Sequence, residues 1–180
     1  MSDVAVRPLG EDDWQDFRAI RLEALAESPE AFAARLAEEE GFAEDFWRLR
    51  LRRSARLVAE SAAGQRVGVV SVGLASGDDG VVPDVAEIFG LWVRPDARGS
   101  GVATKLVQAS AAQAQRDGRS HIAYWVGTDN GRAVAFASGM GFRPTDYRRA
   151  MRTLAGEETG EQEIAMVLPL GEDRGVAFHL

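Results

Sequence analysis

Apolar residues recur along the chain with two different periods, one typical of helices and one typical of strands. Near the start they are spaced three or four residues apart, which places them on one face of a helix: Trp14, Phe17, Ile20 and Ala24. In residues 66–74 they alternate with small or polar residues, as in a strand of a sheet. The pattern therefore predicts a mixed α/β protein.

Gly, Pro and capping residues at the ends of the periodic stretches indicate where the elements begin and end. Strands are expected at residues 4–9, 55–61, 66–74, 85–93, 122–126, 142–151 and 163–170. Helices are expected at residues 30–40, 42–51, 102–116 and 132–140, after a first helix capped by Asp12 or Asp13. Because a helix connects the strands at 85–93 and 122–126, we expect these two strands to lie side by side and parallel.

Charged residues of the N-terminal helices are expected at the surface. Glu38, Glu39 and Glu40 form an acidic run that predicts a solvated helix end. The arginines among the apolar positions of the next helix are also expected to be exposed: Arg48, Arg50, Arg52 and Arg53. Both expectations follow from the usual place of charged side chains, which is in water.

The stretch from Ala86 to Thr104 carries the clearest chemical signal. An apolar run ends at Val93, a helix is expected to begin near Val102, and a turn with two glycines lies between them. The N–H groups of a first helical turn have no partners within the helix and lie at the positive end of its dipole. The stretch therefore predicts a phosphate or pyrophosphate site.

The amino-acid composition argues against several kinds of functional site and partner. The 180 residues suffice for one domain, so we expect a single domain over residues 1–180, in which 171–180 form a loose tail. The absence of Cys excludes disulfides and thiolate chemistry, and the two isolated histidines give no metal-ligand pattern, so no metal is expected. A net charge of -7 argues against a nucleic-acid partner, and no apolar run is long enough to span a membrane. We expect a cytoplasmic protein.

The turn fits neither of two common phosphate loops. It lacks the Gly-Lys pair of a Walker loop and the three spaced glycines of a dinucleotide fingerprint. Residues 98–103, RGSGVA, are instead similar to Q/R-x-x-G-x-G/A, the pyrophosphate loop of the GNAT superfamily of acyl-CoA-dependent N-acetyltransferases. Residues 86–93, AEIFGLWV, resemble the fourth strand of that family, and residues 130–142 resemble its N-x-x-A-x-x-L-Y-x-x-x-G-F motif.

The resemblance implies a GNAT fold, a mixed and mostly antiparallel central sheet with parallel but splayed fourth and fifth strands, flanked by helices. It implies that the fourth-strand backbone binds the pantetheine arm of acetyl-CoA through Leu91, Trp92 and Val93. The pyrophosphate would be bound by Arg98, Gly99, Ser100, Gly101, Val102, Ala103 and Thr104. The Arg98 side chain either contacts the phosphate or is a surface charge.

The downstream motif implies two further cofactor contacts, Asn130 and Phe136. An Asn before a helix is also a typical cap, and the two roles are compatible. Ala137 departs from the pattern, because many relatives have there a Tyr that protonates the departing thiolate. A thiol has a pKa of about 8.5, so a thiolate leaves without a strictly required acid. Ser138, Tyr147, Tyr124 and water remain alternatives.

Glu87 is the expected general base. In a regular strand it shares a face with apolar neighbours, where a carboxylate is paired, has a raised pKa or performs chemistry. The pattern alone favours an Arg-paired strand carboxylate over a catalytic one. The resemblance implies instead that it accepts the proton of the incoming amine, since an alkylammonium group has a pKa of about 10.4 and must lose a proton before it attacks.

The implied activity is acetyl transfer from acetyl-CoA to a primary amine of a small molecule or peptide, by direct attack in a ternary complex. The alternative is a noncatalytic domain that binds or senses acyl-CoA, favoured by Ala137. The acidic net charge favours a cationic acceptor. A homodimer is compatible with the resemblance, since dimers are frequent among similar proteins.

Overall fold

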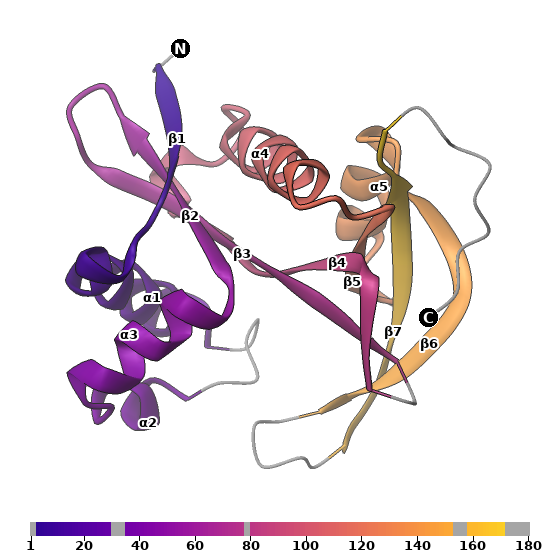
Figure 1. Ribbon diagram of the computed structural model, residues 1–180, viewed down its shortest axis with the longest axis horizontal. Helices are drawn as coiled ribbons and strands as arrows, with labels where there is room; N and C mark the ends of the chain where they lie inside the picture. Colours follow the sequence, from indigo (N-terminus) through magenta and orange to yellow (C-terminus); the bar gives the residue numbers. More distant parts are fainter. Residues whose placement is uncertain (1–2, 30–34, 78–79, 153–157, 172–180) are drawn as a thin grey trace. The chain divides into compact units, whose positions relative to one another are not determined.

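The computed structural model describes residues 3–29, 35–77, 80–152 and 158–171 (Figure 1). The expected helix start at residues 30–34 and nearly all of the expected tail lie outside these residues. The chain divides into two compact units. Unit 1 comprises Met1–Ser71 and Gly90–Ser110, and unit 2 comprises Val72–Phe89 and Ala111–Leu180.

The elements follow the expected order. The strands are β1 (Val4–Pro8), β2 (Ala55–Ser61), β3 (Arg66–Gly77), β4 (Gly80–Val93), β5 (His121–Gly127), β6 (Arg143–Arg152) and β7 (Glu158–Pro169). The helices are α1 (Trp14–Glu27), α2 (Leu36–Glu40), α3 (Glu44–Arg53), α4 (Val102–Arg116) and α5 (Gly131–Gly139), with 3-10 turns η1 (Glu11–Asp13) and η3 (Pro95–Ala97). The strands form one mixed sheet in the order β1-β2-β3-β4-β5-β7-β6. The predicted α/β class is confirmed.

The core of unit 1 confirms the helical periodicity. Helices α1, α2 and α3 lie together beside β2 (Figure 1), and the Phe17 and Trp47 rings meet edge to face with centroids 5.7 Å apart. The buried residues of this cluster are Leu9, Phe17, Ile20, Ala24, Trp47, Leu51, Val58, Val69 and Trp92. Burying such side chains stabilises the fold by about 1.5–3 kcal/mol each.

The expected exposure of Glu39 and Arg50 is wrong. Glu39 is 1% exposed, and its carboxylate accepts hydrogen bonds from Arg21 at 3.1 Å and from Arg50 at 2.6 Å. Burial opposes its charge, but the two guanidinium groups together lower the pKa of Glu39. Glu38 and Glu40 are exposed as predicted. Only the central carboxylate of the run is therefore structural.

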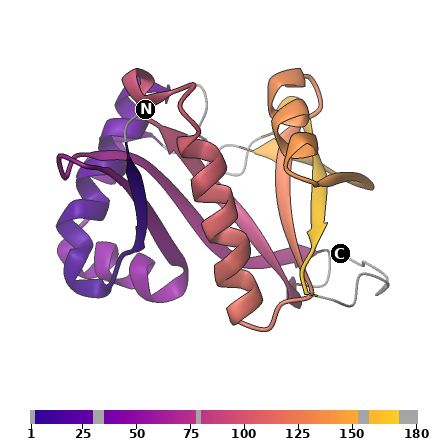
Figure 2. The same ribbon diagram turned by 90° about the horizontal axis from the view of Figure 1, so that it is seen from above.

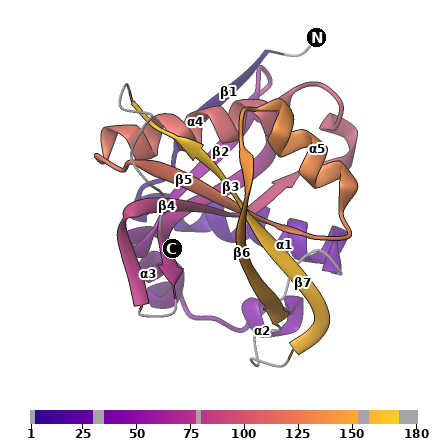
Figure 3. The same ribbon diagram turned by 90° about the vertical axis from the view of Figure 1, so that its right-hand side faces the viewer.

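Unit 2 is organised around β5. The parallel register of β4 and β5 runs from Val85↔His121 to Ile88↔Tyr124, and β5 pairs antiparallel with β7 along its whole length (Figure 3). β6 pairs antiparallel with β7, and α5 lies against β5 (Figure 2). The expected parallel neighbours are confirmed.

β4 is not a regular strand at Gly90. This residue has a φ of +63°, a left-handed conformation that favours glycine and marks a bulge inside a strand. Trp92 and Val93, which follow it, are both buried. The expected alternation that places Glu87 on one face with its apolar neighbours therefore applies only to the part of β4 before Gly90.

Candidate active site

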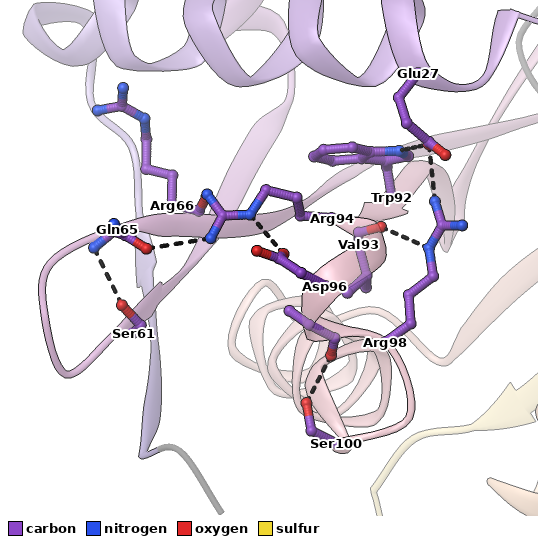
Figure 4. Close-up of polar contacts among 11 residues, drawn as sticks. Glu27, Ser61, Gln65, Arg66, Trp92, Val93, Arg94, Asp96, Arg98 and Ser100 are labelled. Atoms are coloured by element: carbon purple, nitrogen blue, oxygen red, sulfur yellow. Dashed lines mark hydrogen bonds and ion pairs between the residues drawn. The ribbon is translucent and has the colours of Figure 1, made fainter.

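The turn before α4 needs its glycines for their backbone conformation. Gly99 and Gly101 have φ values of +77° and +85°, and a Cβ at either position would meet nothing within 4 Å. The constraint is therefore the left-handed backbone, which other residues adopt only with strain. The Ser100 hydroxyl donates a 2.6 Å hydrogen bond to the Ala97 carbonyl and fastens the turn (Figure 4).

This turn delivers the N-terminus of a 15-residue helix. Helix α4 begins at Val102, and the Lys105 N–H donates to the Gly101 carbonyl at 3.1 Å. The N–H groups of Val102, Ala103 and Thr104 precede that bond, so they have no acceptor within the helix. Together with the positive end of the helix dipole they suit an anion such as pyrophosphate.

Arg98 ties the turn to two other elements. Its Nε donates to the Val93 carbonyl at 2.9 Å, and its Nη2 donates to the Glu27 carboxylate at 2.8 Å (Figure 4). About half of the Arg98 side chain is exposed. The guanidinium thus joins the end of β4 to the end of α1, and its contact with a phosphate stays a prediction.

Glu27 is a part of this site that sequence reasoning missed. Its carboxylate also accepts a 2.8 Å hydrogen bond from the Trp92 indole and one from the Ser28 hydroxyl. The Ser28 and Trp92 hydrogen bonds, together with the Arg98 charge, lower the pKa of Glu27. Trp92 lies 65 residues from Glu27 along the chain, so no local pattern indicated the contact.

The three residues expected to hold the pantetheine differ in burial. Trp92 belongs to the core of unit 1 with 4% exposure, Val93 is buried, and Leu91 is half-buried. The Val93 carbonyl already accepts from Arg98. The contact of the backbone of Leu91 and Trp92 with the pantetheine arm stays a prediction.

Glu87 lies in unit 2 and has a cation beside it. Its side chain is 15% exposed, and Arg149 Nη1 on β6 lies 3.4 Å from its Oε1. The Arg149 Nε donates to Glu163 on β7 at 2.8 Å, and the guanidinium lies over the Trp125 ring, 4.1 Å from its centroid. The Arg-paired carboxylate predicted from the pattern alone is therefore observed.

Burial raises the pKa of Glu87 despite this pairing. The Arg149 charge lowers it, the Glu163 charge raises it, and the Arg149 hydrogen bond and the neighbouring Trp125 N–H lower it. That N–H is buried and has no hydrogen-bond partner among the residues that the structure describes. A carboxylate whose pKa is raised in this way is a stronger base than an ordinary one, so it is suited to accept a proton.

The other predicted residues of unit 2 lie on α5 or next to it. The Asn130 side chain accepts from the Ala133 N–H at 3.1 Å, which confirms the cap. Phe136 is half-buried, whereas Ala137 is 1% exposed, so position 137 faces packed side chains. Tyr124 contacts Phe142, on the face of β5 opposite to Trp125, because neighbouring residues of a strand face opposite ways.

The predicted site residues thus fall into two groups. Residues 91–93 and 98–104 belong to unit 1, where Glu27 joins them, and Glu87, Asn130 and Phe136 belong to unit 2. Arg149, Glu163 and Trp125 join Glu87, and no sequence motif had indicated them.

Comparisons of the sequence and the fold with known proteins identify the family. The profile of the acetyltransferase (GNAT) family matches residues 14–142. An N-acetyltransferase of Methanocaldococcus jannaschii, described as uncharacterized, is 39% identical over 59 residues, which are 33% of this chain and 26% of that protein. The match thus spans about a quarter of the relative's length.

Two solved structures have the same fold. A GNAT acetyltransferase from Streptococcus pneumoniae superposes with a TM-score of 0.70 and 15% identity, over 94% of this chain and 100% of the other. A protein from Salmonella typhimurium, described as an acetyltransferase with its cofactor acetyl-CoA, superposes with a TM-score of 0.67 and 20% identity, over 96% of each chain. The expected GNAT fold is confirmed, and the chain belongs to the acetyltransferase (GNAT) family.

Proposed function

We propose that this protein transfers an acetyl group from acetyl-CoA to a primary amine. The observation that carries the proposal is a mostly buried carboxylate of raised pKa, Glu87, on the same strand that leads into an anion-binding turn. Family membership and a structural neighbour solved with acetyl-CoA support this choice of co-substrate.

The phosphate end of acetyl-CoA is assigned to the turn before α4. The N–H groups from Gly99 to Thr104 and the α4 dipole bind the pyrophosphate. Arg98 acts here as a positioning residue, since its two hydrogen bonds join the turn to Val93 and Glu27. Leu91 offers backbone groups to the pantetheine arm, and Asn130 and Phe136 are further contacts of the cofactor.

Glu87 is assigned the proton transfer. An acceptor R–NH₃⁺ gives one N–H proton to the Glu87 carboxylate, and the nitrogen keeps the electron pair of that bond. Bound acetyl-CoA supplies an activated thioester, so attack of R–NH₂ on its carbonyl carbon forms the C–N bond and breaks the C–S bond. The second N–H proton of the nitrogen passes to the departing thiolate or to water, which leaves the neutral amide. A thiol pKa of about 8.5 makes the thiolate an adequate leaving group.

A panel of amines tests the proposal. The protein is titrated with acetyl-CoA by calorimetry, and thiol release is then followed with alkylamines, polyamines, amino acids and peptides, with the acetylated product identified by mass spectrometry. We expect acetyl-CoA to bind and at least one amine to be acetylated. Binding without turnover on any amine would favour a noncatalytic acyl-CoA-binding domain, and absence of binding would overturn both functions.

A further inference from the structure

Four side chains of unit 2 lie on one face of the sheet. Glu87 pairs with Ala123, Trp125 follows two residues later on β5, and Gly127 pairs with Glu163 on β7. Alternate residues of a strand share a face, and paired residues point to the same side, so Glu87, Trp125 and Glu163 face one way. Arg149 on β6, directly opposite Glu163, completes the group.

The floor of this group is made of small residues. Ala123 and Ala165 are fully buried, and Gly127 has no side chain. The Trp125 ring rises among them, and the two carboxylates lie on the strands at either side. The arrangement, which we call the cation cradle, consists of Glu87, Trp125 and Glu163.

The cradle already holds a cation, the guanidinium of Arg149. The two carboxylates bind the guanidinium unequally. Arg149 Nε lies 2.8 Å from Glu163, whereas Arg149 Nη1 lies 3.4 Å from Glu87. The Trp125 ring lies under the guanidinium at 4.1 Å, a distance suited to a cation–π contact. Arg149 is 44% exposed, whereas Glu87 is 15% and Glu163 is 20% exposed. The cation is therefore the most accessible part of the group.

The charges do not balance. When both carboxylates are ionised they carry two negative charges, and Arg149 supplies one positive charge. The group therefore keeps a net negative charge next to an aromatic face, which attracts a second cation and repels an anion.

We propose that the cation cradle receives the alkylammonium group of the acceptor, which takes the place of the Arg149 guanidinium on Glu87 and Trp125. This inference rests on the proposed acetyl transfer and names its substrate class: a cationic alkylamine without a carboxylate next to the amine. Arg149 keeps its shorter contact, that with Glu163, and gives up the longer one with Glu87. Once the guanidinium has moved away, the Glu87 carboxylate lies next to the ammonium proton that it accepts.

The experiment uses two probes, methylguanidinium and n-butylammonium, each as the chloride, with potassium chloride at equal ionic strength as the blank. Binding is followed by the NMR signal of the Trp125 indole N–H, which Trp125→Phe identifies. No acetyl-CoA is present. The proteins compared are the wild type, Arg149→Ala and, to guard against misfolding of that variant, Arg149→Gln.

We expect both probes to bind the two Arg149 variants about fivefold more tightly than the wild type, because the internal competitor is gone. Adding Glu87→Gln or Glu163→Gln to Arg149→Ala, which keeps the Trp125 reporter, is expected to abolish the gain. Glu161→Gln changes an exposed carboxylate on β7, the strand of Glu163, and is the matched control. It should leave the gain in affinity unchanged.

Equal affinity of the wild type and both Arg149 variants would overturn the proposal. A gain that persists after Glu87→Gln and Glu163→Gln would also overturn it, since the cation would then bind elsewhere. Because binding is measured without acetyl-CoA, these outcomes do not depend on turnover. Tighter probe binding together with failure of every amine to be acetylated would leave the cradle as a cation site and remove the transferase function.

Discussion

The Glu27 carboxylate at the end of α1 accepts a 2.8 Å hydrogen bond from the Trp92 indole on β4 and holds Arg98 of the phosphate turn at the same time. One side chain thus links a core tryptophan to the turn that precedes α4. We expect that weakening this contact also weakens binding of the acetyl-CoA pyrophosphate.

We therefore expect Glu27→Gln to raise the Kd for acetyl-CoA by about threefold, because the ion pair with Arg98 is lost while the side-chain shape is kept. Calorimetric titration measures this change. Glu23→Gln, an exposed carboxylate one turn earlier on α1, is the control and should bind acetyl-CoA as the wild type does. Equal Kd values for all three proteins would show that the ion pair between Arg98 and Glu27 does not contribute to acetyl-CoA binding.

Gly101→Ala is expected to destabilise the turn by about 1–2 kcal/mol, because φ at this position is +85°. The acetyl-CoA affinity should fall with it, since the N–H groups that follow would be re-aimed. Gly139→Ala is a matched control on α5, where φ is not positive and a Cβ would meet nothing within 4 Å. It should leave acetyl-CoA binding unchanged. Urea denaturation and calorimetry of both variants provide the comparison.

Glu39→Ala is expected to lower the free energy of unfolding by about 3–5 kcal/mol, because two guanidinium groups would lose their buried partner. Glu38→Ala changes an exposed neighbour and should cost less than about 0.5 kcal/mol. Urea denaturation of the two variants measures the difference. Similar losses would mean that the Glu39 ion pairs do not hold α2 in place.

The raised pKa of Glu87 predicts how its replacement changes stability with pH. The ordinary pKa of a Glu carboxyl group is 4.5. When the pKa of such a group is higher in the folded state, the folded protein becomes less stable as the pH rises above 4.5, because the group ionises first in the unfolded chain. Glu87→Gln cannot ionise. Its free energy of unfolding, relative to the wild type, should therefore increase between pH 4 and pH 7, and urea denaturation at both values tests this. A decrease over that interval would mean that the pKa of Glu87 is lowered instead.

Local patterns were sufficient to predict most of the fold. The bounds of α4 agree with the expected helix at both ends, because an apolar face, two glycines before it and Asp117-Gly118 after it all act within a few residues. The parallel pairing of β4 and β5 followed from their helical connection. The Asn130 cap followed from the residue type and its place before a helix.

The parts that could not be predicted depend on long-range contacts. Arg149 lies 62 residues from Glu87, and Arg98 lies 71 residues from Glu27, so no window of sequence contains both partners. Glu39 has two exposed acidic neighbours, and only its partners Arg21 and Arg50 distinguish it from them. Charged residues are placed by such partners, which periodicity does not reveal.

In the proposed reaction, Glu87 removes the proton from the acceptor amine. Its most direct test is kcat/KM for thiol release as a function of pH, with the best amine of the panel, in the wild type and in Glu87→Gln, with Glu161→Gln as control. We predict an acidic limb above pH 4.5 in the wild type, and in Glu87→Gln no such limb and a rate about 100-fold lower at unchanged acetyl-CoA affinity. A Glu87→Gln protein with the rate and pH profile of the wild type would contradict the claim.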